Sequence, residues 1–173
     1  MSNIETTPPL PAAPQPITSL LVRYGYLRLI GQFGYEGQRP ACGSRLVLRT
    51  RRGTEIGYAL GTTCIGTGCP ATISPEKLDA YIDLSGGPDY PFSTEGRVLR
   101  IATNIDLAEQ RHIDLAKPEY IQFCRQLIND MQLPMKLVEV ELLLGGEMAT
   151  FYFLSEHRVD FRTLVKELAA QFH

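Results

Sequence analysis

The chain has 173 residues, a formal net charge of −2, 44% hydrophobic residues and 21% charged residues. This composition is typical of a globular protein and excludes a fully disordered chain. The net negative charge excludes a protein that holds nucleic acid by an overall positive field, so a nucleic-acid contact would have to be a local patch. The length predicts one compact unit.

The pattern of apolar residues and cysteines excludes two further classes. No run approaches the roughly 20 apolar residues of a membrane-spanning helix, and the N-terminus lacks a basic segment followed by an apolar one. Four cysteines are too few for a disulfide framework, so reduced thiols are expected. We therefore expect a cytoplasmic protein that is neither exported nor inserted in a membrane.

The chain is predicted to consist of a tail and one folded domain. Residues 1–18 are rich in proline and have no apolar period, which predicts a disordered tail before a domain at 19–173. Within the domain, residues 61–96 are rich in Gly, Pro, Ser and Thr, and so long a stretch predicts an inserted loop. Ser74 is a suitable N-cap before Pro75, which predicts a short helix inside this loop.

The front of the domain has the pattern of short strands. Apolar and β-branched runs separated by turn residues predict a small bent sheet or an open barrel. Two of these runs flank residues 51–54, where Gly53 can adopt a positive φ, so they are expected to form a hairpin. The predicted strands span residues 20–24, 26–33, 45–50, 55–60 and 98–102.

After residue 102 the apolar period lengthens to that of a helix. Thr103 followed by Asp106 is typical of a helix start, and Pro118 is expected to kink this helix or to begin a second one. Beyond Pro118, apolar residues at spacings of three and four predict one buried stripe. The stripe consists of Tyr120, Ile121, Cys124, Leu127, Ile128 and Met131.

A β-hairpin is predicted next, because residues 136–144 and 148–154 are rich in strand formers and flank the Gly145-Gly146 pair. Period-two alternation predicts three apolar residues on the buried face and two glutamates on the solvent face. The apolar residues are Val138, Val140 and Leu142, and the glutamates are Glu139 and Glu141.

The last predicted element is a helix that covers this hairpin. Asp160 is a suitable N-cap, and Val159 and Leu164 have the spacing of a hydrophobic staple. The apolar face is expected to contain Phe161, Leu164, Val165, Leu168, Ala169 and Phe172. The whole chain is thus predicted to be α+β, with a small bent sheet or barrel-like N-terminal half followed by a helix, a hairpin and a helix whose apolar faces form the main core.

Three segments of the C-terminal half carry a family resemblance: Phe123-Cys-Arg-Gln-Leu-Ile, Leu133-Pro-Met-Lys-Leu-Val-Glu-Val-Glu and Arg158-Val-Asp-Phe-Arg-Thr-Leu-Val-Lys-Glu-Leu-Ala. In the front half, Arg45-Leu-Val-Leu-Arg-Thr-Arg-Arg-Gly-Thr-Glu-Ile-Gly agrees as well. Over residues 20–60 and 97–172 the chain closely resembles the C-terminal domain family of the polymerase-suppressor (PSP) proteins, whose bacterial members are the YaaT or RicT proteins. The tail and residues 61–96 lie outside the resemblance.

The resemblance implies a bacterial, cytoplasmic regulatory or adaptor subunit without enzyme activity. Bacterial members of the family assemble with small helical partners and are linked to ribonuclease Y, and trypanosomatid members occur in RNA-binding complexes. The expected partners are therefore proteins of an RNA-processing or signalling complex, with RNA as a further candidate. The family's iron-sulfur cysteine segment is absent from this chain, so no cofactor is expected.

Arginines form the densest basic group and are the candidate residues for binding nucleic acid or a protein partner. Alternate arginines on a hairpin share one face, where they could meet RNA phosphates or an acidic partner. Neutralisation by neighbouring glutamates on a solvated surface is the alternative interpretation. The candidates are Arg45, Arg49, Arg51, Arg52 and Arg100, with Arg97 nearby. Direct RNA binding by this arginine-rich hairpin is the alternative function.

No metal or catalytic site is predicted. Cys64 and Cys69, with Cys42 as a third cysteine, are weak candidates for metal ligands, because four ligands are wanted and the spacing is not Cys-x-x-Cys. His112, His157 and His173 are scattered and have no nucleophile at a suitable spacing, so they are expected on the surface.

Overall fold

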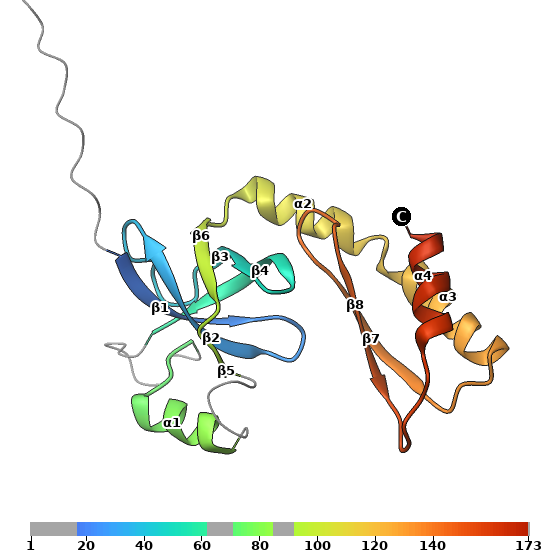
Figure 1. Ribbon diagram of the computed structural model, residues 1–173. Helices are drawn as coiled ribbons and strands as arrows, with labels where there is room; N and C mark the ends of the chain where they lie inside the picture. The colour runs from blue at the N-terminus through green and yellow to red at the C-terminus, as the bar shows by residue number, and fades with distance from the viewer. Residues whose placement is uncertain (1–16, 62–70, 85–91, 173) are drawn as a thin grey trace, which may run out of the picture.

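The computed structural model describes residues 17–61, 71–84 and 92–172, which form two parts (Figure 1). The first part is a β-barrel with one helix beside it, and the second part contains three helices and a β-hairpin. This architecture confirms the predicted α+β class with a barrel-like front half. Among the described residues, no helix is both long enough and apolar enough to cross a membrane.

The barrel consists of five strands in a closed sheet and a short strand at its side. These are β1 (Ile17–Tyr24), β2 (Leu29–Glu36), β3 (Arg45–Thr50), β4 (Gly53–Leu60), β6 (Gly96–Ile101) and the short β5 (Phe92–Ser93). β1 pairs antiparallel with β2 and β4, and β3 pairs antiparallel with β4 and β6. Because β6 also lies parallel to β2, the ring of strands is closed.

Alternate residues of the strands fill the barrel, as the period of two requires. Gly57 of β4 lies where the interior is tight, since a Cβ atom there would collide with the Leu48 side chain and lie 3.0 Å from the carbonyl oxygen of Arg23. The interior cluster consists of Leu20, Val22, Tyr24, Phe33, Tyr35, Leu46, Leu48, Ala59 and Val98. The barrel is therefore a filled core, and only its outer residues are available for binding.

The structure confirms the predicted hairpin turn of the barrel and moves the start of one predicted strand. The β3–β4 hairpin is confirmed, and Gly53 has a φ of +134°. The second strand begins at Leu29 and not at Tyr26, because residues 25–28 form a turn in which Arg28 N–H donates to the Gly25 carbonyl at 3.0 Å.

The inserted region contains helix α1 (Pro75–Leu84), which confirms the predicted short helix. The Ser74 hydroxyl accepts a hydrogen bond from Lys77 N–H at 3.3 Å, as expected of an N-cap. Apolar residues of α1 pack on a second small cluster of the barrel made of Leu21, Ile30, Leu60 and Phe92.

The second part of the chain has a core of its own. Its elements are α2 (Asn104–Asp114), α3 (Lys117–Asp130), β7 (Lys136–Leu142), β8 (Ala149–Leu154) and α4 (Arg162–Gln171). β7 and β8 form a two-stranded antiparallel hairpin, α3 packs on β7, and α4 packs on α3. Figure 1 shows α2 running from the barrel toward this hairpin.

The helix starts predicted at Thr103 and Pro118 and the predicted stripe are confirmed. Thr103 and Asp106 form a capping box, in which the Thr103 N–H donates to the Asp106 carboxylate at 2.8 Å. Pro118 lies in the first turn of α3 and thus begins a second helix. All six residues of the predicted stripe on α3 lie in a core with Leu137, Val140, Leu142, Leu164 and Leu168.

The predicted face of Val138 is wrong. The register of the hairpin shifts between Leu137 and Glu139, so Val138 is the extra residue of a β-bulge. Leu137 is 3% exposed and takes the buried position, whereas Val138 is 40% exposed. The bulge therefore places Leu137 in the core in place of Val138. After the bulge, Val140 and Leu142 are buried as predicted.

The start of the last helix also differs from the prediction. Phe161 is the N-cap and makes no side-chain cap bond, while the Asp160 carboxylate accepts from Arg162 N–H at 3.1 Å and pairs with the Arg162 guanidinium. Leu164 and Leu168 are buried as predicted, but Phe161 and Val165 are 52% and 54% exposed and Ala169 is exposed as well. The β7–β8 hairpin has two strands and is narrower than the adjacent helices α3 and α4, so it cannot cover the apolar faces of both helices completely.

Candidate nucleic-acid and partner interface

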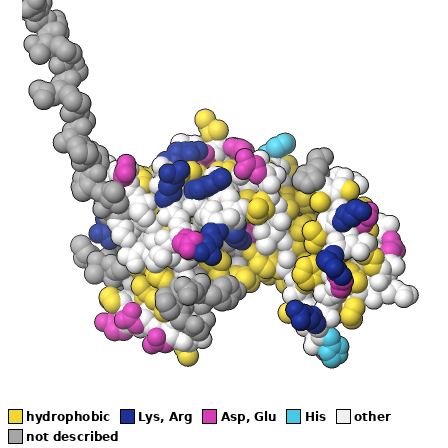
Figure 2. Space-filling view, viewed as in Figure 1, with side chains coloured by type: hydrophobic (Ala, Val, Ile, Leu, Met, Phe, Trp, Pro, Cys, Tyr) yellow, Lys and Arg dark blue, Asp and Glu magenta, His cyan; other side chains and the backbone are white. Residues whose placement is uncertain are grey.

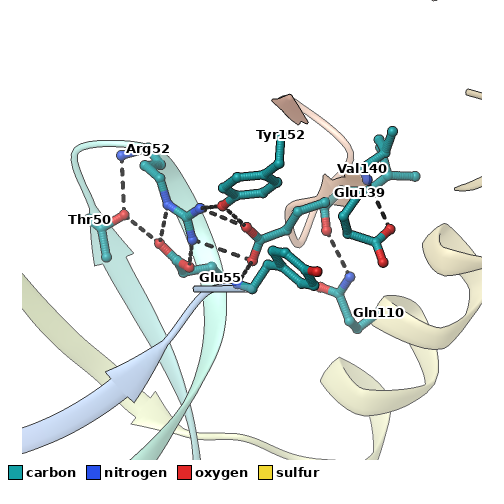
Figure 3. A network of polar contacts seen from close by, with 10 residues as sticks. Thr50, Arg52, Glu55, Gln110, Glu139, Val140 and Tyr152 are labelled. Carbon is teal, nitrogen blue, oxygen red and sulfur yellow. Dashed lines mark hydrogen bonds and ion pairs between the residues drawn. The ribbon is translucent and has the colours of Figure 1, made fainter. Parts of the chain in front are cut away.

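The barrel and the hairpin meet at Arg52, which lies in the turn between β3 and β4. Its guanidinium donates to the Glu141 carboxylate at 2.7 Å and to the Tyr152 hydroxyl at 2.9 Å, and it forms an ion pair with Glu55 (Figure 3). The Tyr152 hydroxyl in turn donates to Glu141 at 2.6 Å. Tyr26 of the β1–β2 turn stacks at a tilt on Tyr152. Two barrel turns thus hold one face of the hairpin.

The charges in this junction are strongly coupled. Burial opposes the charge of Arg52, but hydrogen bonds to Glu141 and Glu55 outweigh burial and raise its pKa. Burial dominates at Glu55 and raises its pKa despite the Arg52 and Thr50 hydrogen bonds. At Glu141, hydrogen bonds from Arg52 and Tyr152 outweigh burial and lower the pKa. One arginine therefore neutralises two carboxylates that would otherwise repel each other.

The predicted solvent face of the hairpin is accordingly wrong at Glu141. The barrel covers this face, so the Glu141 side chain is only 17% exposed and is bound to Arg52. Glu139 also points into the junction, where Lys117 lies 3.7 Å from its carboxylate. The sequence pattern predicted no role for Glu55 or Tyr152 in this junction. The signal that could have indicated a shared arginine is the pair of glutamates, Glu55 and Glu141, on two separate hairpins.

Two of the candidate arginines contact other side chains of the molecule, although Arg45 is exposed. Arg52 holds the junction, and Arg45 lies over the ring of Tyr58, with the guanidinium carbon 6.0 Å from the ring centre. Arg45 lines a cavity of about 320 Å³ between the barrel and the second part. Charges of both signs line this cavity, including Arg111, Asp114 and Lys117.

Arg49 and Arg97 come together on the outside of the barrel. They are direct cross-strand partners on β3 and β6, and both are exposed. The Arg49 guanidinium donates to the Thr54 hydroxyl at 2.9 Å, which orients it. Arg51 lies beside them in an exposed ion pair with Glu95. Figure 2 shows Lys and Arg side chains gathered over the barrel with acidic side chains among them.

Arg100 belongs to a different neighbourhood. Its guanidinium forms an ion pair with Asp106 of the α2 capping box. The Thr103 backbone hydrogen bond is the main cause of the lowered pKa of Asp106, and Arg100 adds to it. The structure therefore divides the predicted arginine group into a junction residue, a cavity residue, a helix-start residue and an outer cluster.

The cysteine candidates for a metal site are only partly described. The Cys42 thiol donates to the Ala71 carbonyl at 3.1 Å, while Cys64 and Cys69 lie outside the described residues. Within the described ranges, no group of three or more His, Cys, Asp and Glu residues is arranged to hold a metal ion. Cys124 lies in the core of the second part, where burial raises its pKa to about 11.

The histidines do not converge on the candidate interface. His112 on α2 and His157 in the β8–α4 connection are both exposed, in line with the expectation for surface residues. His173 lies outside the described residues.

The fold and the interface define an α+β protein in which a β-barrel precedes a helix, hairpin and helix unit. Comparison with known families matches residues 96–173 to the "PSP1 C-terminal conserved region". This part of the chain is similar to the PSP1 C-terminal family, in line with the resemblance found in the sequence. The match begins at the last barrel strand, so residues 20–60 lie outside it.

A curated relative supports the same assignment. The chain is 36% identical over 76 residues to "Stage 0 sporulation protein YaaT" of Bacillus subtilis (strain 168), which covers 44% of this chain. The aligned part spans 28% of the length of the Bacillus protein. No solved structure matches the chain.

Proposed function

We propose that the protein is a regulatory adaptor of the YaaT type, which binds protein partners in an RNA-processing or signalling complex and catalyses no reaction itself. The match of residues 96–173 to the PSP1 family and the 36% identity over 76 residues to a sporulation protein support a regulatory role. The adaptor role rests on the surface of the same unit. The proposed cytoplasmic location and the lack of a cofactor follow from the same family resemblance.

The observation that carries this proposal is an uncovered apolar pair on α4. Phe161 and Val165 lie one helical turn apart, and they are 52% and 54% exposed. Leu164 and Leu168 of the same helix are buried against the core. An apolar stripe that continues from the core onto the surface of a helix is typical of a protein–protein contact.

The hairpin offers a second contact beside this helix. On the outer edge of β7, Gln110 donates to the Leu142 carbonyl at 2.9 Å and the Glu139 carboxylate accepts from Val140 N–H at 2.8 Å. β8 pairs only with β7 among the described strands. Its other edge is therefore available to an extended segment of a partner, which would add a strand to the sheet.

The test is affinity capture from a native bacterial lysate followed by peptide identification. We expect the wild-type protein to recover a defined set of proteins, and we expect Phe161→Ser with Val165→Ser to lose most of that set. Removing two exposed apolar anchors from a contact typically costs about 1–2 kcal/mol each, which together is a loss of roughly thirtyfold or more in affinity.

The matched control is Thr163→Ser with Ala170→Ser, because both residues are exposed and lie on the opposite side of the same helix. The control should retain the captured proteins. Equal recovery by the two double variants would contradict a contact through α4, and recovery of no protein by the wild type would contradict the adaptor function.

A further inference from the structure

The outer cluster on the barrel places two like charges opposite each other. Arg49 and Arg97 are direct partners across β3 and β6, and cross-strand residues of this kind lie about 5 Å apart at their Cβ atoms. Like charges in this position are destabilising. Among the described residues neither arginine has an ion pair, so their charges are not neutralised as those of Arg52 and Arg100 are.

The surroundings of the pair favour a bound anion. Arg49, Arg97 and Arg51 line one shallow depression together with Thr50, Glu95 and Gly96. Among the described residues of this lining, Glu95 is the single acid, and it is paired with Arg51. The described lining therefore has three guanidinium groups against one carboxylate, a net charge of about +2, on a chain whose total is −2.

We propose that this depression, lined by Arg49, Arg51 and Arg97, binds the phosphate backbone of RNA. Guanidinium groups form paired hydrogen bonds with phosphate oxygens, and an array of them on neighbouring strands can follow successive phosphates. The part of this lining that the structure describes contains no aromatic residue on which a base could stack. The binding is therefore weak, independent of sequence and strongly dependent on salt.

This inference goes beyond the adaptor function, because β3 lies outside the part of the chain that matches the family and α4 contributes nothing to the depression. The protein would thus have two separate binding surfaces, one on the C-terminal unit and one on the barrel. The C-terminal unit binds a protein partner, and the outside of the barrel binds RNA.

The test is fluorescence anisotropy with a labelled single-stranded RNA of mixed sequence, measured on the full chain between 50 and 200 mM salt, which is about the range where phosphate contacts are most visible. Each phosphate contact to a single strand contributes roughly −0.7 to the slope of log K against log salt. We expect Arg49→Ala with Arg97→Ala to reduce this slope by about 1.4 and to weaken binding at low salt by tenfold or more.

The matched control is Arg158→Ala with Arg162→Ala, which removes the same charge from exposed positions of the second part. This control should bind RNA within about twofold of the wild type if the site is local. A third variant should have the opposite effect: Glu95→Gln removes the acid of the described lining and should tighten binding by about two- to fivefold. A structural role for these residues would not produce that gain.

The proposal is overturned if the wild type does not bind RNA at 50 mM salt, or if both double-arginine variants lose the same affinity. Competition by an acidic poly-glutamate peptide, added at the same charge concentration as unlabelled RNA, tests whether the depression binds an acidic protein instead of RNA. Competition as strong as that of unlabelled RNA would assign the depression to an acidic protein and contradict an RNA site. Weak competition supports phosphate recognition.

Discussion

Arg52 of the β3–β4 turn and Glu141 of β7 lie 89 positions apart in the chain, yet their side chains are bound at 2.7 Å. This pair joins the barrel to the hairpin unit, and Glu55 and Tyr152 complete its hydrogen bonds. Because the barrel carries the outer arginine cluster and the hairpin unit carries the exposed face of α4, the pair fixes the orientation of the two proposed binding surfaces.

Replacing Arg52 by Met should strongly destabilise the protein. The substitution leaves Glu55 and Glu141 buried without their shared cation, which typically costs about 3–5 kcal/mol. The free energy of unfolding from urea titration measures this loss. The control is Arg51→Ala, which breaks the exposed pair with Glu95 and should cost less than about 1 kcal/mol. Equal losses in the two variants would show that the junction is not a structural clamp.

The acid sensitivity of the protein should depend on Asp106. Its pKa is lowered in the folded state by the hydrogen bond from the Thr103 backbone and, further, by the Thr103 hydroxyl and Arg100. A lowered pKa stabilises the fold above the ordinary value of 3.8, and this contribution is lost as the pH falls below 3.8 through the folded-state pKa.

Asp106→Asn removes this titration. The difference in unfolding free energy between wild type and variant should be largest near neutral pH and should shrink as the pH falls below about 4. Urea titrations at several pH values measure it. A difference that stays constant between neutral and strongly acidic pH would contradict the assignment.

The β-bulge makes a prediction about neighbouring residues. Leu137→Ala should cost about 2–5 kcal/mol because Leu137 is buried, whereas Val138→Ala should change stability by no more than about 0.5 kcal/mol. Thermal or urea unfolding of the two variants measures both values. A larger loss of stability for Val138→Ala than for Leu137→Ala would indicate that Val138 is the buried residue, as regular alternation predicts. That result would contradict the bulge.

Features that depend on neighbouring residues were predicted from the sequence, whereas the β-bulge was not. The capping box at Thr103, the Gly53 turn and the stripe on α3 are local signals, because their partners lie within a few residues, and all three were predicted. The bulge at Val138 has no local signal, since an extra residue in a strand leaves the composition unchanged.

The candidate site depended more heavily on tertiary structure. The sequence placed six arginines in one group, but the partner of Arg52 lies on a distant hairpin and the partner of Arg49 lies beyond the inserted region. Strand order decides which arginines meet, and no spacing in the chain encodes it. The exposure of Phe161 could not be predicted either, because it follows from a sheet of only two strands beneath two helices.

The adaptor function is tested most directly by affinity capture with and without ribonuclease. The wild-type protein is used to capture partners from a native lysate, and half of the sample is digested with ribonuclease before washing. We expect the same proteins to remain bound after digestion, because α4 contacts them directly. Loss of all captured proteins on digestion would show that RNA alone links them to the chain and would contradict the adaptor function.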